Sequence, residues 1–195
     1  IFTHLFLCVW VFALAHWRRE RRPGYLIMLV PLQVLWANLH GGYIFALVLG
    51  ALMTGTAAVL VWRPGWSKDE GYTRSDVKTL AALTVACLAA SLVNPNGLGL
   101  LEFSLNIGLA SDYIKQVVFE WASPLGPKYA RSYGREAALG MFLLMWLGLA
   151  LNVKRRPFLD AMLALLASVM AVQAIRFISF IGILGFPLGF APGGR

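Results

Sequence analysis

The sequence predicts an all-α fold, namely a polytopic transmembrane helical bundle of about seven helices with one amphipathic external segment. Hydrophobic residues make up 59% of the 195 residues and charged residues only 13%. This composition is more apolar than one soluble core requires. Clusters of Arg and Lys, and polar motifs rich in Gly, Asn and Pro, divide the chain into apolar runs. We expect residues 1–195 to form a single transmembrane domain.

Four of the expected spanning helices lie in the first half of the chain, at 1–17, 24–39, 43–62 and 79–94. Each approaches the roughly 20 mostly apolar residues that a spanning helix needs. The second and third form a hairpin, because Gly41 and Gly42 permit a tight reversal between them. The fourth ends at Asn94-Pro95-Asn96-Gly97, since proline disfavours helix in the residue before it. We expect the charged segment 63–78 to be a solvated connector.

The second half contains one long polar segment, 98–136, followed by three further expected spans. Leucines recur in this segment at near-helical spacing, with Glu102, Asn106 and Asp112 interleaved. That pattern predicts a helix lying in the membrane interface, on the external side. The remaining spans are 137–152, 158–175 and 177–191.

The distribution of basic residues predicts the orientation of these spans. Twelve Lys and Arg residues lie in segments that would be cytoplasmic and five in segments that would be external, which accounts for all 17. The loops 18–23, 63–78 and 153–157 are therefore expected inside, and 95–136 outside. The first span would run from outside to inside and the chain begins at Ile1, so we expect a segment to precede it.

The net charge of +8 is better explained by the lipid bilayer than by nucleic acid. The basic residues sit directly at helix ends, where they contact anionic lipid, and they have no aromatic platform on which bases could stack. Cys8 and Cys87 fall inside expected helices and have neither disulfide nor metal spacing. We therefore expect no nucleic-acid partner and no metal-binding residues.

Two polar motifs of the external side are candidates for chemistry. His40 lies between Asn38 and the two glycines, so its ring and nearby backbone amides could reach a phosphate, or the ring could simply cap the turn. Glu120 precedes Trp121, so the carboxylate could act as a general acid or base while the aromatic ring stacks on a sugar. The alternative is a surface carboxylate beside a tryptophan that anchors the chain at the membrane interface.

Arg176 is the third candidate, because it interrupts an apolar run from Leu159 to Phe190. An unpaired guanidinium in hydrocarbon costs several kcal/mol, so this side chain must lie at the interface, be paired, or both. It could bind an anionic headgroup through its planar fork, with Gln173 one turn earlier sharing the role. The alternative is a salt bridge to Glu120 or Asp112.

Four motifs together resemble those of a bacterial group of polytopic membrane proteins. They are Leu35 to Tyr43 (LWANLHGGY), Leu92 to Gly97 (LVNPNG), Phe119 to Pro124 (FEWASP) and Ala174 to Phe177 (AIRF). That group is similar to the GT-C type of membrane glycosyltransferase, which uses lipid-phosphosugar donors. The resemblance covers roughly residues 25–185.

The resemblance implies a multi-pass protein of the bacterial inner (plasma) membrane that transfers a sugar, with inversion, from a polyprenyl-phosphate-linked donor on the external face. It implies no resident cofactor, with divalent-metal dependence left open. The catalytic base of such enzymes usually lies in the first outer loop, which would precede Ile1; within this chain Glu120 is the catalytic candidate. His40 and Arg176 would bind the donor phosphate, and the substrate would be lined by Asn38, Asn94, Trp121 and Gln173.

These external motifs are expected to border one outward-opening cavity. Two other classes of function remain open at this point. A non-catalytic membrane assembly subunit would need no catalytic pair, and a secondary transporter would place polar residues at mid-membrane in paired broken helices.

Overall fold

The computed structural model describes residues 2–66, 71–108, 121, 123–126, 133–151 and 158–185. All regular secondary structure in these residues is helical, which confirms the all-α prediction. The chain divides into two units, residues 1–109 with 192–195, and residues 110–191, and each is described by itself. The expectation of a single transmembrane domain stays a prediction.

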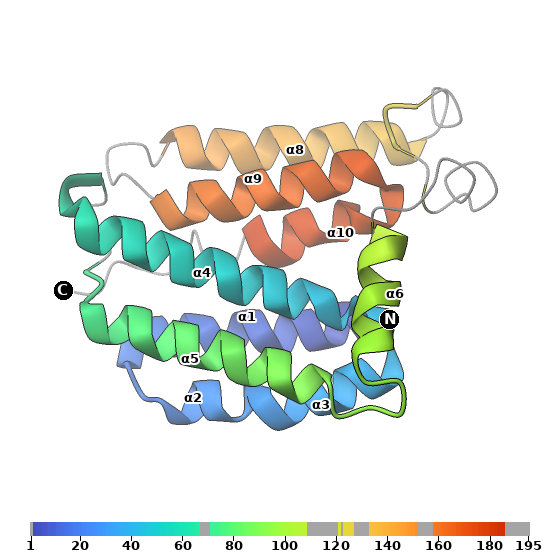
Figure 1. Cartoon of the computed structure of the whole chain (residues 1–195). Coiled ribbons are helices and arrows are strands. Elements are labelled where there is room, and N and C mark those ends of the chain that lie inside the picture. The colour runs from blue at the N-terminus through green and yellow to red at the C-terminus, as the bar shows by residue number, and fades with distance from the viewer. Residues whose placement is uncertain are drawn as a thin grey trace. The chain divides into compact units, whose positions relative to one another are not determined.

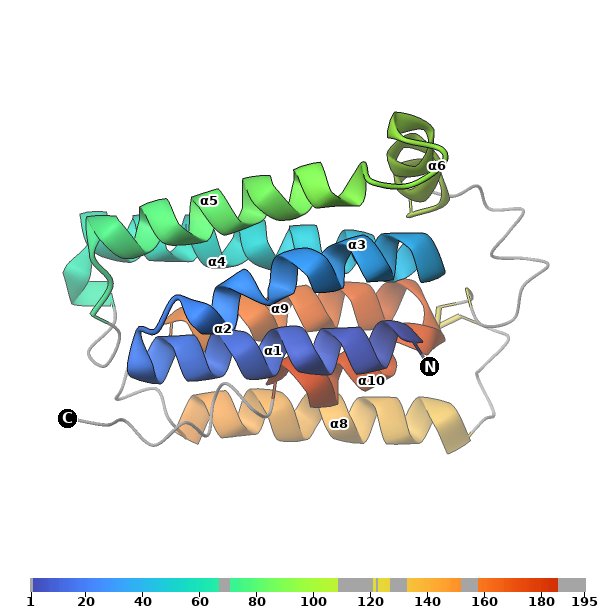
Figure 2. The same cartoon turned by 90° about the horizontal axis from the view of Figure 1, so that it is seen from below.

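The first unit is a bundle of antiparallel helices with one helix across its end. Figures 1 and 2 show α1, α3, α4 and α5 running alongside one another, while α6 crosses their direction where α5 ends. The elements are α1 (Phe2–Glu20), α2 (Gly24–Ile27), α3 (Leu29–Leu39), the 3₁₀ turn η1 (Gly41–Tyr43), α4 (Ile44–Trp62), η2 (Pro64–Trp66), α5 (Arg74–Ser91) and α6 (Leu98–Gly108).

Large aromatic side chains fill the interior of this bundle. Trp10, Trp36 and Tyr43 are fully buried, and the rings of Phe6 and Trp36 stack with their centroids 5.3 Å apart. Burying an aromatic ring removes 150 Å² or more from solvent, as a rough general figure, so these contacts contribute much of the cohesion between α1 and α3.

A close approach at Gly50 joins α4 to α5. A Cβ atom built on Gly50 would come within 2.7 Å of the Thr84 hydroxyl oxygen, so no larger side chain fits there without movement. The hydroxyl oxygens of Thr54 and Thr84 lie 3.4 Å apart at the same level. Small residues at such crossings let two helix backbones approach, a common packing mode of membrane helices.

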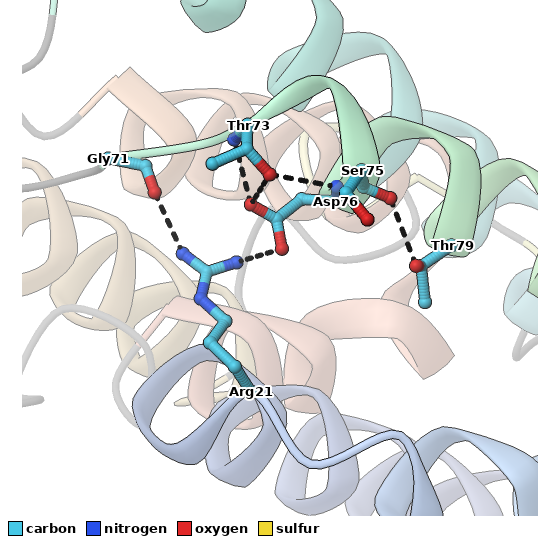
Figure 3. Close-up of polar contacts among 6 residues, drawn as sticks. All are labelled: Arg21, Gly71, Thr73, Ser75, Asp76 and Thr79. Carbon is cyan, nitrogen blue, oxygen red and sulfur yellow. Dashed lines mark hydrogen bonds and ion pairs between the residues drawn. The ribbon is translucent and has the colours of Figure 1, made fainter.

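A group of hydrogen bonds and one ion pair joins the end of α1 to the start of α5, at the end of the unit opposite α6 (Figure 3). Thr73 and Asp76 form a capping box, in which Asp76 accepts from the Thr73 amide at 2.7 Å and the Thr73 hydroxyl accepts from the Asp76 amide at 3.2 Å. Arg21, which takes a left-handed backbone (φ 56°), pairs with Asp76 at 3.0 Å and donates to the Gly71 carbonyl at 3.0 Å. The cap explains why α5 begins at Arg74, ahead of residue 79 where the apolar pattern alone placed its start.

The second unit contains two long helices and a broken one. Its elements are α8 (Tyr133–Leu151), α9 (Phe158–Gln173), the 3₁₀ turn η6 (Ile175–Phe177), α10 (Ile178–Phe180) and the π-helical turn η7 (Ile181–Gly185). The indole Nε1 of Trp146 donates to the Ser168 hydroxyl at 3.1 Å, which ties α8 to α9. The basic cluster 154–156 and the end of the expected span 177–191 lie outside the described residues.

The described helices differ in how well they match a bilayer. The helical stretch Gly41–Trp62, 22 residues long, is the one in the described residues that is long and apolar enough to cross a membrane; Gly24–Leu39 and Phe158–Gln173 are apolar but shorter. The other expected spans, 1–17, 79–94, 137–152 and 177–191, are not supported by this criterion within the described residues. Length and composition therefore support one crossing directly.

Candidate functional site

The predicted site residues fall into two groups, one in each unit. Asn38, His40 and Asn94 belong to the first unit, and Trp121, Gln173 and Arg176 to the second. Glu120, the catalytic candidate, and Asp112 lie outside the described residues. The expectation that the two groups border one cavity stays a prediction.

His40 caps the turn that begins the second helix of the hairpin. Its backbone is extended (φ −162°, ψ 136°), and its ring Nδ1 accepts a hydrogen bond from the Gly42 amide at 2.9 Å. The Thr3 hydroxyl oxygen lies 2.9 Å from the same nitrogen. A backbone N–H can only donate, so Nδ1 carries no proton and the Thr3 hydroxyl donates to it as well. The neutral ring therefore carries its proton on Nε2.

Close packing explains one of the two glycines in this turn. A Cβ atom on Gly42 would collide with the side chain of Thr3 and would lie 3.1 Å from His40 Nδ1, whereas one on Gly41 would meet only the Ser104 hydroxyl oxygen, at 3.9 Å. Gly42 is therefore required by close approach. Gly41 is not.

The two asparagines hold helix ends together. Asn38 donates from Nδ2 to the carbonyls of Val34 and Val93, at 2.8 Å each, which links the end of α3 to the segment after α5. Asn94 accepts from the Asn96 amide at 2.8 Å and donates to the Ser91 carbonyl at 2.7 Å. These contacts shape the turn that Gly97 completes with a positive φ of 50°. Both amides thus have defined structural contacts.

A buried amide beside this group was not anticipated from the sequence. Gln33 is fully buried, and its Nε2 donates to the Tyr43 carbonyl at 3.2 Å and to the Ser91 hydroxyl at 2.9 Å. The Ser91 hydroxyl in turn donates to the Cys87 carbonyl at 2.8 Å. The available signal was a lone glutamine within the apolar run 24–39, since a polar side chain there must find partners inside the bundle.

In the second unit the structure brings Arg176 and Trp121 together. The guanidinium carbon of Arg176 lies 4.8 Å from the centre of the Trp121 ring and 5.6 Å from that of Phe177. Trp121 and Phe177 meet edge to face, with centroids 6.0 Å apart. Arg176 is half-buried and lies in η6, where helix α9 has just ended. Two residues that are 55 positions apart (176 − 121) thus form one aromatic and cationic cluster.

A short segment after Trp121 is fixed to the end of α9. The Ser123 hydroxyl donates to the Val172 carbonyl at 2.6 Å and accepts from the Leu125 amide at 3.2 Å. Gln173, the last residue of α9, is exposed beside this contact. The hydrogen bond from Ser123 to Val172 holds the segment close to the end of α9, so that Trp121 lies beside Arg176 in η6.

The cluster is suited chemically to an anion with an attached polar group. A guanidinium close to an aromatic ring can still donate two parallel hydrogen bonds from its planar fork to phosphate oxygens. No described carboxylate pairs with Arg176. No group of three or more His, Cys, Asp or Glu side chains within the described ranges could hold a metal ion.

Comparisons of the chain with protein-family models, with curated proteins and with solved structures found no match.

Proposed function

We propose that this chain belongs to a multi-pass protein of the bacterial inner membrane that acts as a GT-C-like glycosyltransferase, transferring a sugar from a polyprenyl-phosphate-linked donor on the external face. The observation that carries the proposal is the half-buried Arg176 guanidinium, whose central carbon lies 4.8 Å from the centre of the Trp121 ring, just after the end of α9. The motifs that carry the resemblance contain both residues.

The surface of the helices supports a membrane environment. Large apolar side chains are exposed along α1, α5 and α8, among them Phe12 (57%), Val85 (65%) and Leu143 (68%). Soluble monomers rarely expose large contiguous apolar patches, whereas a bilayer covers apolar helix faces with acyl chains. In a membrane the shorter apolar helices can span if the polar ends reach the headgroups or the bilayer thins locally.

The polarity of the first unit's two ends supports one orientation. The last turn of α1 contains Arg18 and Arg19, and Arg21 and Arg22 follow it. The contact of Arg21 with Asp76 puts the start of α5 beside them. The contact between Thr3 and His40 puts the polar motifs at the opposite end of α1. With the basic end cytoplasmic, α6 lies across the external end, as an interfacial helix does (Figure 2).

The chemistry of Arg176 supports binding of the donor phosphate. Stacking against an aromatic ring contributes about 0.5–2 kcal/mol, which offsets part of the cost of keeping a cation near hydrocarbon. The remaining requirement is an anion at the N–H edge, and a lipid-linked phosphate at the membrane surface supplies it. Such positioned positive charge also stabilises the charge that develops on a phosphate leaving group.

A non-catalytic assembly subunit is the second candidate. It is favoured by the hydrogen bonds of Asn38, His40 and Asn94, which account for these motifs by folding alone.

Donor affinity of Arg176 variants tests the proposal. In the full-length protein in nanodiscs, Arg176→Ala should weaken binding of a polyprenyl-phosphate sugar by about 1.5–3 kcal/mol, the range for a hydrogen bond to a charged group. Arg176→Lys should restore only part, since the planar fork is lost. Arg74→Ala, an exposed arginine at the basic end of the first unit, is the matched control and should bind as the wild type does.

Thermal unfolding of the same variants separates the two candidate functions. The transferase proposal predicts that Arg176→Ala loses donor affinity while its melting temperature changes little. Unchanged donor affinity with a much lower melting temperature would make Arg176 a structural residue and would favour the assembly subunit.

A further inference from the structure

The amino end of the helix that starts at Gly41 has an amide available for a ligand. The helical stretch Gly41–Trp62 runs for 22 residues. The Gly42 amide donates to His40 Nδ1 at 2.9 Å, and the Tyr43 amide donates to the His40 carbonyl at 3.3 Å. Within the described part of the chain the Gly41 amide has no such acceptor. The first amides of a long helix, together with its dipole, favour an anion at this position.

A second, independent donor on α6 lies close to Gly41. Ser104 is only 7% exposed, and its hydroxyl has no hydrogen-bond partner among the described residues. That hydroxyl oxygen lies 3.9 Å from the position of a Cβ atom on Gly41. Other helical hydroxyls in this unit behave differently, since Thr84 and Ser91 each donate to the carbonyl four residues earlier at 2.8 Å. A buried hydroxyl without a partner costs free energy unless a bound group satisfies it.

We propose that the Gly41 amide and the Ser104 hydroxyl bind a phosphate oxyanion at the end of the first unit. The proposal rests on the proposed function, a lipid-phosphate donor bound on the external face. It specifies the Gly41 amide among the backbone amides near His40 and adds the Ser104 hydroxyl, which the sequence motifs did not indicate. Charge supports an anion, because the helix end is positive and the nearest carboxylate on α6, Glu102, is exposed two residues away, on the other side of that helix.

The phosphate could be that of a polyprenyl phosphate lipid or free inorganic phosphate, and the test distinguishes these sources. Binding is measured for the full-length protein in phosphatidylcholine nanodiscs, once with polyprenyl monophosphate in the bilayer and once with inorganic phosphate in solution. Ser104→Ala should weaken binding about tenfold, as expected for one hydrogen bond to a charged group. Its melting temperature should stay equal or rise, because the hydroxyl has no partner to lose.

Gly41→Ala provides a second variant that does not depend on removing a side chain. The added methyl group would lie at ordinary contact distance, 3.9 Å from the Ser104 hydroxyl oxygen. The variant should therefore fold normally, and the methyl group should occupy space between Gly41 and Ser104 that a bound phosphate would need. Ser75→Ala, an exposed serine at the opposite end of the unit, is the control and should bind as the wild type does.

The outcomes separate this site from the proposed function. The phosphate site is overturned if Ser104→Ala and Gly41→Ala bind both phosphate forms as tightly as the wild type does. The transferase proposal then still stands if Arg176→Ala weakens polyprenyl phosphate binding. Ser104-dependent binding of inorganic phosphate, with no binding of the lipid, supports the site and contradicts the donor function. Ser104-dependent binding of the lipid alone supports the site and identifies the lipid as its source. Wild-type protein that binds neither form overturns both.

Discussion

His40 has a defined structural role that is separable from any role in binding. Its Nδ1 accepts from the Gly42 amide and the Thr3 hydroxyl, so this nitrogen is committed to the turn. The neutral ring with its proton on Nε2, not the imidazolium, is the form that fits these contacts. Loss of function in a His40 variant would by itself not distinguish a broken cap from a lost ligand contact.

A pair of substitutions at His40 makes that distinction. His40→Ala removes the acceptor for the Gly42 amide and should lower the free energy of unfolding by about 0.5–2 kcal/mol, the cost of losing an N-cap. His40→Asn should restore most of this stability, because asparagine is among the best capping residues. Denaturant unfolding and donor binding are measured on both variants. If His40→Asn recovers stability and donor affinity together, the ring contributes nothing to binding beyond the cap.

At the scale of helices, the sequence predicted well which segments are helical and in what order they follow, but it placed some helix boundaries poorly. The ends of α3 and α4 fall at residues 39 and 62 as the apolar runs indicated, because glycine and arginine stop both patterns there. The apolar pattern places the start of α5 at residue 79, whereas the helix begins at Arg74, because Thr73 and Asp76 form a capping box. Apolar periodicity alone cannot detect a polar first turn, whereas capping residues can.

The crossing of α4 and α5 yields a prediction with an internal control. Gly50→Ala should lower the free energy of unfolding by about 1–3 kcal/mol, because its methyl group would overpack against Thr84. Gly55→Ala lies in the same helix with open space around its Cβ position, and should instead be neutral or stabilising by up to about 1 kcal/mol. Unfolding in mild detergent measures both. Equal effects at the two positions would show that the helices do not approach at Gly50.

At the scale of the whole molecule, contacts between distant residues were the part that sequence could not predict. The contact of Arg176 with Trp121 and the approach of Ser104 to Gly41 depend on tertiary packing, which no local sequence pattern specifies. The sequence did indicate that polar motifs gather at one end of the helices, and in the first unit they do, opposite the arginines that end α1. Charge and hydropathy thus predict which end a residue occupies, but not its partner.

Cysteine accessibility in intact cells tests most directly the central claim, a membrane bundle whose polar end is external. In a background lacking Cys8 and Cys87, single cysteines replace Ser75 at the basic end and Asn96 at the polar end, both of which are exposed. We predict that an impermeant maleimide labels Asn96→Cys in intact spheroplasts and labels Ser75→Cys only after permeabilisation. If Ser75→Cys is labelled from outside while Asn96→Cys is protected, the orientation is the reverse of the one proposed. If neither cysteine is labelled before lysis and both are labelled in the soluble fraction, the membrane bundle itself is contradicted.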